Sequence, residues 1–336
     1  MKAVGYQQAG DLDRADALQD IELPRPEPGP RDLLVKVAAV SVNPVDAKIR
    51  RNRAPLTGAY DVLGWDAVGT VEATGAEVSA FKAGDRVYYA GAVNRPGCNA
   101  EYHLVDERIV GRAPASLSDA QAAALPLTAI TAWELLFDRL GVAEGGGAGQ
   151  TMLVIGAAGG VGSILVQLAR QLTKLTVVAT ASRPESVQWI SDLGAHHVID
   201  HNQPMLAQLQ TIGIEQVELV ASLTHTAEHY EQYIECLAPQ GKLGLIDDFD
   251  SLDVLKLKPK CLSLHWEFMF ARSLHQTPDM IEQSRLLNRV AELVDKGTLK
   301  TTLGEHFGTI NAANLLKAHR LLESHQARGK LVLEGF

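Results

Sequence analysis

The spacing of hydrophobic residues changes along this chain and divides it into two regions. Before about residue 124 the apolar runs are short and are interrupted by Gly and Pro, which predicts a mainly β region. Strands are predicted at residues 3–6, 33–42, 101–105 and 108–111, and glycines within 62–74 predict the bends of a small coiled barrel. Helical spacing then appears in a short segment capped by Ser118 and in a longer one, 128–140, that ends at Gly141.

From Thr151 onward, short apolar runs alternate with amphipathic segments. This pattern predicts strands at 152–155, 175–180, 197–199, 217–221 and 242–246, and helices at 161–172, 184–193, 204–210 and 225–237. Strands and helices in regular alternation are typical of a parallel sheet covered on both faces. The predicted fold class is therefore α/β.

Residues 261–270 have a period of two, with Leu262, Trp266 and Phe270 on one face, which predicts a late strand of the same sheet. An edge strand with an apolar face can pair with a second copy, so we expect a homodimer. Helices at 279–296 and 311–324 and a terminal strand at 330–334 complete the predicted elements.

The composition narrows the class of protein. A length of 336 residues suggests two domains, and 46% hydrophobic residues are enough for sizeable cores. The net charge of −9 does not indicate a nucleic-acid or anionic-membrane partner. Three scattered cysteines (Cys98, Cys236 and Cys261) argue against a disulfide framework. We find no signal peptide and no apolar run long enough to span a bilayer, and we expect a cytoplasmic location.

The stretch from Thr151 to Ser163 is the most informative motif. A strand leads into the small-residue turn Gly156–Gly162 and then into a helix, which is the context of a dinucleotide-binding fingerprint. We expect Ala158, Gly159, Gly160 and Val161 to lie along the pyrophosphate, with Gly159 allowing close approach of the backbone and Gly162 allowing tight helix packing. Ala157 replaces the first glycine of G-x-G-x-x-G, so the motif departs from the pattern at that position.

The end of the second predicted strand bears on which nicotinamide cofactor is used. NAD sites usually carry an acidic residue there for the ribose 2′-hydroxyl, but no carboxylate occurs before Glu185. Ser182 and Arg183 could instead bind a 2′-phosphate, which favours NADPH. The alternative is that Ser182 caps the next helix and Arg183 is solvated.

Five stretches resemble the medium-chain dehydrogenase/reductase superfamily: Val40–Asp46, Leu63–Gly69, Phe81–Val87, Ala123–Ala129 and Gly156–Gly162. Within it, the chain resembles the quinone oxidoreductase branch and its subgroup of zinc-type alcohol dehydrogenase-like proteins. The resemblance implies a discontinuous GroES-like coiled β-domain (1–124 and 271–336), a Rossmann doubly wound parallel sheet (125–270), and an active site in a cleft between them. It also implies further cofactor contacts at Thr131, His201, Ser222, Ile246, Phe270 and Lys330.

The resemblance also bears on metal binding. In zinc alcohol dehydrogenases of this superfamily, a cysteine and the histidine of a Gly-His-Glu motif are zinc ligands. Here the matching residues are Asn43 and Trp65, and Trp cannot ligate zinc. We therefore expect no metal.

Without a Lewis acid a simple alcohol is a poor substrate, whereas a quinone or an α,β-unsaturated ketone spreads the charge that follows hydride transfer. We predict an NADPH-dependent reductase of such acceptors. Asn43 is the candidate polar group near the acceptor oxygen, Trp65 the residue that fills the space of the missing metal, and Tyr89 a candidate proton donor or packing residue. The alternatives are a zinc-type alcohol dehydrogenase or aldehyde reductase, and a non-catalytic, crystallin-like NADPH-binding protein.

Overall fold

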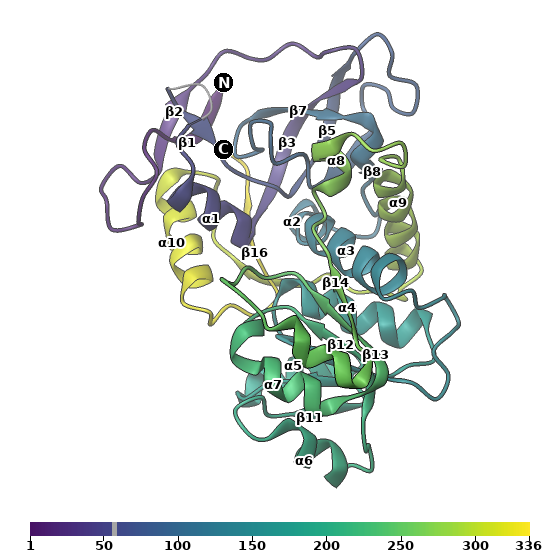
Figure 1. The fold of residues 1–336 in the computed structure, drawn as a ribbon. Helices are drawn as coiled ribbons and strands as arrows, with labels where there is room; N and C mark the ends of the chain where they lie inside the picture. The colour runs from purple at the N-terminus through teal and green to yellow at the C-terminus, as the bar shows by residue number, and fades with distance from the viewer. Residues whose placement is uncertain (56–58) are drawn as a thin grey trace. The chain divides into compact units, whose positions relative to one another are not determined.

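The computed structural model describes residues 1–55 and 59–336 (Figure 1). Contacts divide the chain into two compact units: unit 1 comprises Met1–Ile130 with Phe270–Phe336, and unit 2 comprises Thr131–Met269. The sequence analysis placed these boundaries at 124/125 and 270/271. The boundary between Ile130 and Thr131 falls within a helix, and the hydrophobic spacing along that helix does not change where one unit ends and the other begins.

Unit 2 contains a six-stranded sheet in the order β11-β10-β9-β12-β13-β14, and every neighbouring pair is parallel. Its strands are β9 (Thr151–Ile155), β10 (Thr176–Thr180), β11 (His197–Ile199), β12 (Val217–Ser222), β13 (Leu237–Leu245) and β14 (Ser263–Trp266). The connecting helices are α4 (Gly160–Leu172), α5 (Pro184–Asp192), α6 (Met205–Thr211) and α7 (Thr226–Cys236). The order reverses at β9, which places crossover helices on both faces and confirms the doubly wound α/β fold.

The last strand of this sheet is shorter than predicted. β14 ends at Trp266, and the predicted apolar face is reversed around this point, because Trp266 and Phe268 are each 51% exposed whereas the polar Glu267 is 3% exposed. Arg139 Nε lies 2.8 Å from Glu267 Oε2, a contact within unit 2 that no local pattern indicates.

Unit 1 is built mainly from antiparallel strands. A seven-stranded sheet has the order β15-β16-β3-β5-β6-β8, with β7 also on β3, and a three-stranded sheet has the order β2-β1-β4. The strands are β1 (Lys2–Tyr6), β2 (Gln19–Glu22), β3 (Asp32–Val42), β4 (Asp61–Val62), β5 (Ala67–Thr74), β6 (Arg86–Tyr89), β7 (Tyr102–Asp106), β8 (Val110–Arg112), β15 (Leu303–His306) and β16 (Lys330–Glu334). β3 is the long central strand, and two register shifts against β5 bend it. At Gly69 a Cβ would lie 2.2 Å from Lys36 O, so this close crossing requires glycine.

The sequence analysis missed one helix that bears on the site. α1 (Pro44–Asn52) follows β3 directly, with Pro44 in its first turn and Asp46 Oδ2 accepting a hydrogen bond from Asn43 N at 2.8 Å. Asn-Pro followed by an acidic residue is a helix-start signal. The hydrophobic pattern, however, predicted only the end of the 33–42 strand here.

Other elements of unit 1 fell outside the prediction or shifted. The elements that were not predicted include β2, β15 and α8 (Ala271–His275). The helices α9 (Glu282–Asp295) and α10 (Ala312–Glu323) lie within the predicted spans 279–296 and 311–324 and begin after their first residues. The predicted cap is confirmed: Ser118 Oγ accepts from Gln121 N at the start of α2 (Asp119–Ala123).

The stretch Asp119–Arg139 corrects one expectation. It contains α2, α3 (Pro126–Trp133) and a π-helical turn (Glu134–Arg139), and is long and apolar enough to cross a membrane. The statement that no apolar run has this length was therefore wrong. However, 83% of its most apolar window is buried in the protein, as in a core helix.

Candidate functional site

The turn between β9 and α4 has the geometry of a phosphate-binding loop. Gly156 has a φ of +74°, which favours glycine. At Gly162 a Cβ would lie 2.4 Å from Ala157 Cα and 2.5 Å from Ala157 O. The helix can therefore pack this closely on the turn only because Gly162 has no side chain. Both glycines are thus required by the backbone.

The rim of this loop is open. Ala158, Gly159, Gly160 and Val161 are half-buried, whereas Ala157 and Gly162 are buried. Gly159 is the N-cap of α4 and provides no side-chain cap, so it leaves the first-turn N–H groups to other acceptors. A Cβ on Gly159 would meet only Gly156 O, at 3.4 Å. Backbone N–H groups at the start of a 13-residue helix fit a pyrophosphate.

The residues after β10 lie beside this loop's strand in the sheet. Ser182 is exposed and Arg183 is half-buried. Arg183, rather than Ser182, is the N-cap of α5, and its Nε lies 3.9 Å from Glu185 Oε1. The alternative role of Ser182 as helix cap is therefore wrong, and its hydroxyl remains a candidate ligand group.

The other predicted cofactor contacts in unit 2 differ in their surroundings. The Ser222 hydroxyl bonds to Thr226 Oγ1 at 2.8 Å and to the Tyr233 hydroxyl at 3.0 Å, so it serves the interior of the unit. Ile246 follows β13 and is half-buried, and Thr131 is 5% exposed on α3. His201 follows β11, and its Nδ1 is enclosed with no hydrogen-bond partner among the described residues. An unsatisfied buried nitrogen calls for an explanation such as a ligand contact.

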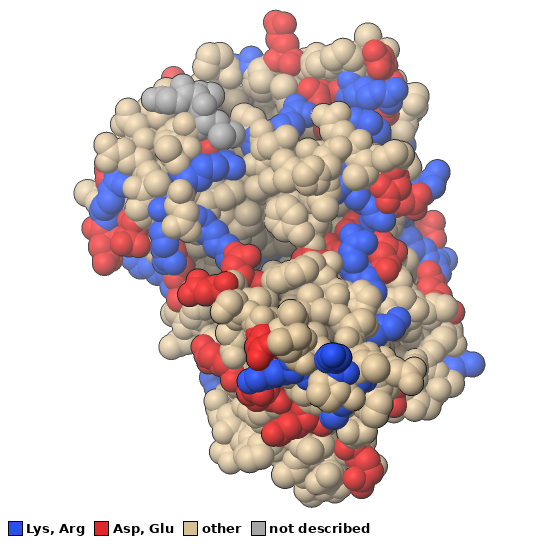
Figure 2. Space-filling model, viewed as in Figure 1, with Lys and Arg blue, Asp and Glu red and all other residues tan. Residues whose placement is uncertain are grey.

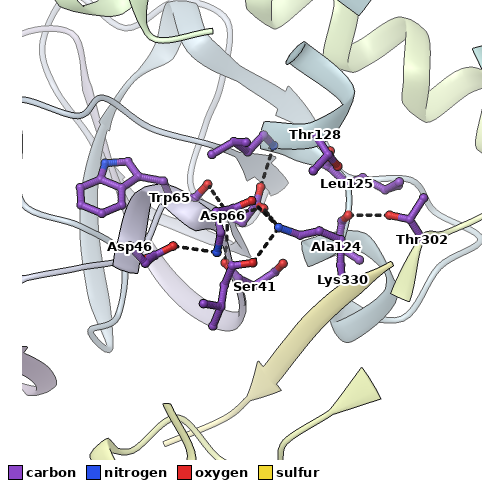
Figure 3. Close-up of polar contacts among 12 residues, drawn as sticks. Ser41, Asp46, Trp65, Asp66, Ala124, Leu125, Thr128, Thr302 and Lys330 are labelled. Carbon is purple, nitrogen blue, oxygen red and sulfur yellow. Dashed lines mark hydrogen bonds and ion pairs between the residues drawn. The ribbon is translucent and has the colours of Figure 1, made fainter. Parts of the chain in front are cut away.

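In unit 1, Asn43, Asp66 and Lys330 form a buried polar cluster. Figure 3 shows Lys330 reaching toward Asp66. Lys330 Nζ lies 3.0 Å from Asp66 Oδ2 and also donates to Asn43 Oδ1 and, at 2.9 Å, to Val42 O. Asn43 Nδ2 donates to Asp66 Oδ2 at 2.8 Å, and Leu127 N in the first turn of α3 donates to Asp66 Oδ1 at 2.7 Å. The cluster thus joins the end of β3, the 65–66 turn, the start of α3 and the start of β16.

The electrostatics of the cluster follow from its burial. Asp66 is 0% and Lys330 is 3% exposed. Burial raises the pKa of Asp66 above its ordinary value, although Lys330 opposes the rise. Burial likewise raises the pKa of Asp46, which caps α1, to about 7. Lys330 is therefore the neighbour that most favours the ionised form of Asp66.

The structure places the three predicted catalytic residues in the interior of unit 1. Both polar atoms of the Asn43 amide are engaged in the cluster and the residue is 1% exposed, so it holds neighbouring groups rather than presenting its amide to an acceptor. Trp65 extends away from Lys330 (Figure 3), donates Nε1 to Ala92 O at 3.2 Å, and meets the Phe270 ring edge-on at 6.5 Å. Tyr89 is 0% exposed and its hydroxyl lies 3.1 Å from His103 Nδ1, an arrangement that favours packing.

These residues do not fit a catalytic zinc ion. Asn43 and Trp65 lack a thiolate or imidazole, and Asp66 is already paired with a resident ammonium. Among the described residues, no cluster of three or more His, Cys, Asp or Glu side chains could hold a metal. The sequence analysis missed the Asp66–Lys330 pair, although the acidic residue retained in Gly64-Trp65-Asp66 was a visible signal.

Comparisons with known proteins identify the family of this chain. Residues 29–115 match the model for the alcohol dehydrogenase GroES-like domain, and residues 193–333 match the zinc-binding dehydrogenase model. A zinc-type alcohol dehydrogenase-like protein of Staphylococcus aureus is 40% identical over 336 residues, covering 99% of both chains. The chain belongs to the medium-chain dehydrogenase/reductase superfamily.

Two further relatives indicate the class of enzyme to which this superfamily member belongs. The crystal structure of a putative zinc-dependent alcohol dehydrogenase protein from Rhizobium etli has 54% sequence identity to this chain and a TM-score of 0.97. The match covers 100% of this chain and 98% of that one. A quinone oxidoreductase of Pseudomonas aeruginosa is 29% identical over 315 residues, 91% of this chain and 92% of its own. This medium-chain dehydrogenase/reductase is therefore an oxidoreductase with both zinc-type and quinone oxidoreductase relatives.

Proposed function

We propose that this protein transfers hydride from NADPH to a quinone or an α,β-unsaturated carbonyl compound without a metal ion. The observation that carries the proposal is the Asn43–Asp66–Lys330 cluster. It engages Asn43, which resembles one zinc-ligating position, and Asp66, which directly follows the other at Trp65, in hydrogen bonds and an ion pair of the fold itself. A zinc ion would need ligands that this donor set does not contain.

The choice of acceptor follows from the chemistry left to the chain. A bound NADPH supplies the hydride. A quinone or enone spreads the resulting negative charge over a conjugated system, so it needs less help than a simple aldehyde. Protonation of the product oxygen is assigned to solvent.

NADPH is proposed because of the groups that end β10. Ser182 and Arg183 stand where an NAD-specific site carries an acidic residue, and the first carboxylate is Glu185. A guanidinium can donate charge-assisted hydrogen bonds to a 2′-phosphate. The half-buried loop Ala158–Val161 would hold the pyrophosphate through its N–H groups.

One assay panel tests the proposal. NADPH oxidation is followed with 1,4-benzoquinone, 9,10-phenanthrenequinone, a small enone and a short aldehyde, each with and without a chelator. Turnover of quinone or enone that is unchanged by the chelator is expected. Turnover of aldehyde alone that is lost with the chelator would refute the proposal in favour of a zinc enzyme, and stoichiometric zinc in protein purified without a metal-affinity tag would do the same.

A second candidate function is binding of NADPH without turnover. The loop geometry favours cofactor binding, whereas the interior position of Asn43 and Tyr89 leaves no obvious proton donor among the described residues. Tight NADPH binding with no turnover in the panel would support it. We also propose a homodimer formed through β14, and a cytoplasmic location.

The surface is consistent with a small-molecule substrate. On the face drawn in Figure 2, Lys and Arg side chains are interspersed with Asp and Glu. Such mixed charge, with a net charge of −9, does not favour a polyanion as partner.

A further inference from the structure

Three histidines meet at the carboxyl edge of the sheet in unit 2. His201 follows β11, His225 is the N-cap of α7, and His229 lies in the first turns of α7. The rings of His201 and His229 are edge-on with centroids 5.9 Å apart, and His225 Nδ1 bonds to Thr224 Oγ1 at 2.8 Å. The carboxyl edge is where ligands bind in doubly wound sheets.

The strand register places this cluster next to the residues proposed to bind the 2′-phosphate. Thr180 of β10 is the partner of Ile199 of β11, and Ala181 N donates to Ile199 O at 3.0 Å. Ser182 and His201 therefore each leave the sheet two residues beyond a paired position, on neighbouring parallel strands. This register therefore puts the backbone of His201 beside that of Ser182 at the same edge of the sheet, where a phosphate bound by Ser182 is expected to approach the His201 ring.

The charged groups around the cluster are of both signs. Asp200 favours a protonated His201 and Glu228 favours a protonated His229, while His225 opposes protonation of both. Asp247 is already engaged by Thr226 N, at 3.0 Å, and by its hydroxyl.

The histidines are therefore poised to respond to an added anion. Burial lowers the pKa of both His201 and His229; His225 lowers both further, and His201 also lowers that of His229. Two negative charges brought beside the rings favour the protonated form. The 2′-hydroxyl of NADH brings none.

We propose that the His201–His229 pair takes up a proton from solvent when the 2′-phosphate of NADPH binds, so that preference for NADPH over NADH strengthens as the pH falls. This inference rests on the proposed function, since it needs NADPH to lie along the Ala158–Val161 loop. It assigns to His201 and His229 a role in cofactor discrimination, and the enclosed Nδ1 of His201 is a polar atom without a hydrogen-bond partner among the described residues.

The test measures binding rather than turnover. Dissociation constants of NADPH and NADH are obtained by calorimetry on the full chain between about pH 8 and pH 6.5, above the second pKa of a phosphate at about 6. Titrations in buffers of different ionisation enthalpy count the protons taken up. Because the pKa of His201 lies below its ordinary 6.5 before binding, a rise of about one unit on binding gives a gain of at most about fourfold in NADPH affinity between pH 8 and pH 6.5. NADH affinity is expected to change by less than about twofold over the same range.

His201→Gln and His229→Gln should remove the proton uptake and flatten the NADPH profile, with Tm measured to confirm folding. His197→Gln is the matched control, because His197 is exposed on the same β11 strand. Tight NADPH binding without proton uptake, or equal pH profiles for the two cofactors, would overturn this inference alone. Loss of the effect in the His197 control would also overturn it. Failure of both cofactors to bind would overturn the proposed function as well.

Discussion

Two glycines of the β9–α4 turn should separate folding from cofactor binding. Gly162 lies inside α4, where Gly→Ala ordinarily stabilises a helix by up to about 1 kcal/mol. Here, however, the new Cβ would lie 2.4 Å from Ala157 Cα, which is backbone and cannot rotate away. Forced overpacking of this kind costs about 1–3 kcal/mol and here exceeds the helical gain.

Gly159→Ala is the matched change in the same turn. Gly159 has a φ of −72° and a ψ of −179°, which alanine adopts readily, and its Cβ would meet only Gly156 O, at 3.4 Å. Replacing glycine by alanine at an N-cap costs about 1 kcal/mol or less. The methyl group would, however, stand where the pyrophosphate is proposed to approach the backbone.

The expected results differ in kind. Gly162→Ala should lose about 2 kcal/mol, which lowers the Tm by roughly 4–8 °C for a domain of this size. Gly159→Ala should lower the Tm by no more than about 4 °C but weaken NADPH binding by about tenfold or more. Differential scanning calorimetry and fluorescence titration with NADPH measure both. Unchanged stability in Gly162→Ala, or unchanged affinity in Gly159→Ala, refutes the loop geometry.

Three further predictions concern the buried charges and the sheet edge. Burial and the neighbouring Glu134 raise the pKa of Glu267 above its ordinary 4.5, so the folded chain keeps a proton that the unfolded chain loses, and stability falls as the pH rises above about 4.5. The Tm of Glu267→Gln relative to the parent protein should therefore increase from about pH 5 to pH 8, and a constant difference contradicts this. Lys330→Met leaves the Asp66 carboxylate buried without its cation and should cost about 3–5 kcal/mol in urea unfolding. Adding Asp66→Asn should recover part of that loss, and additive losses would show that the two residues do not interact. Trp266→Lys should convert a homodimer to monomer in sedimentation, because Trp266 is 51% exposed on edge strand β14; a parent protein that is monomeric at about micromolar concentration rules out the dimer.

Local sequence was sufficient for the elements that depend on neighbouring residues. The strands β9, β10 and β12 of unit 2 are mostly buried apolar runs, and β11 and β16 have the predicted bounds. The β9–α4 turn was predictable because a tight turn followed by a close-packed helix permits few residue types. Alternation of strand and helix, together with the handedness of crossovers, then leaves few possible sheet orders.

The polar interior was decided only by the tertiary structure. Lys330 and Asp66 are far apart in the sequence, and nothing near either residue indicates that they form an ion pair. The same holds for the contact between Arg139 and Glu267, and for the rings of His201, which follows β11, and His229 of α7. Hydrophobic periodicity records which face of an element is buried, whereas the partner of a buried charge depends on which distant segments the fold brings together.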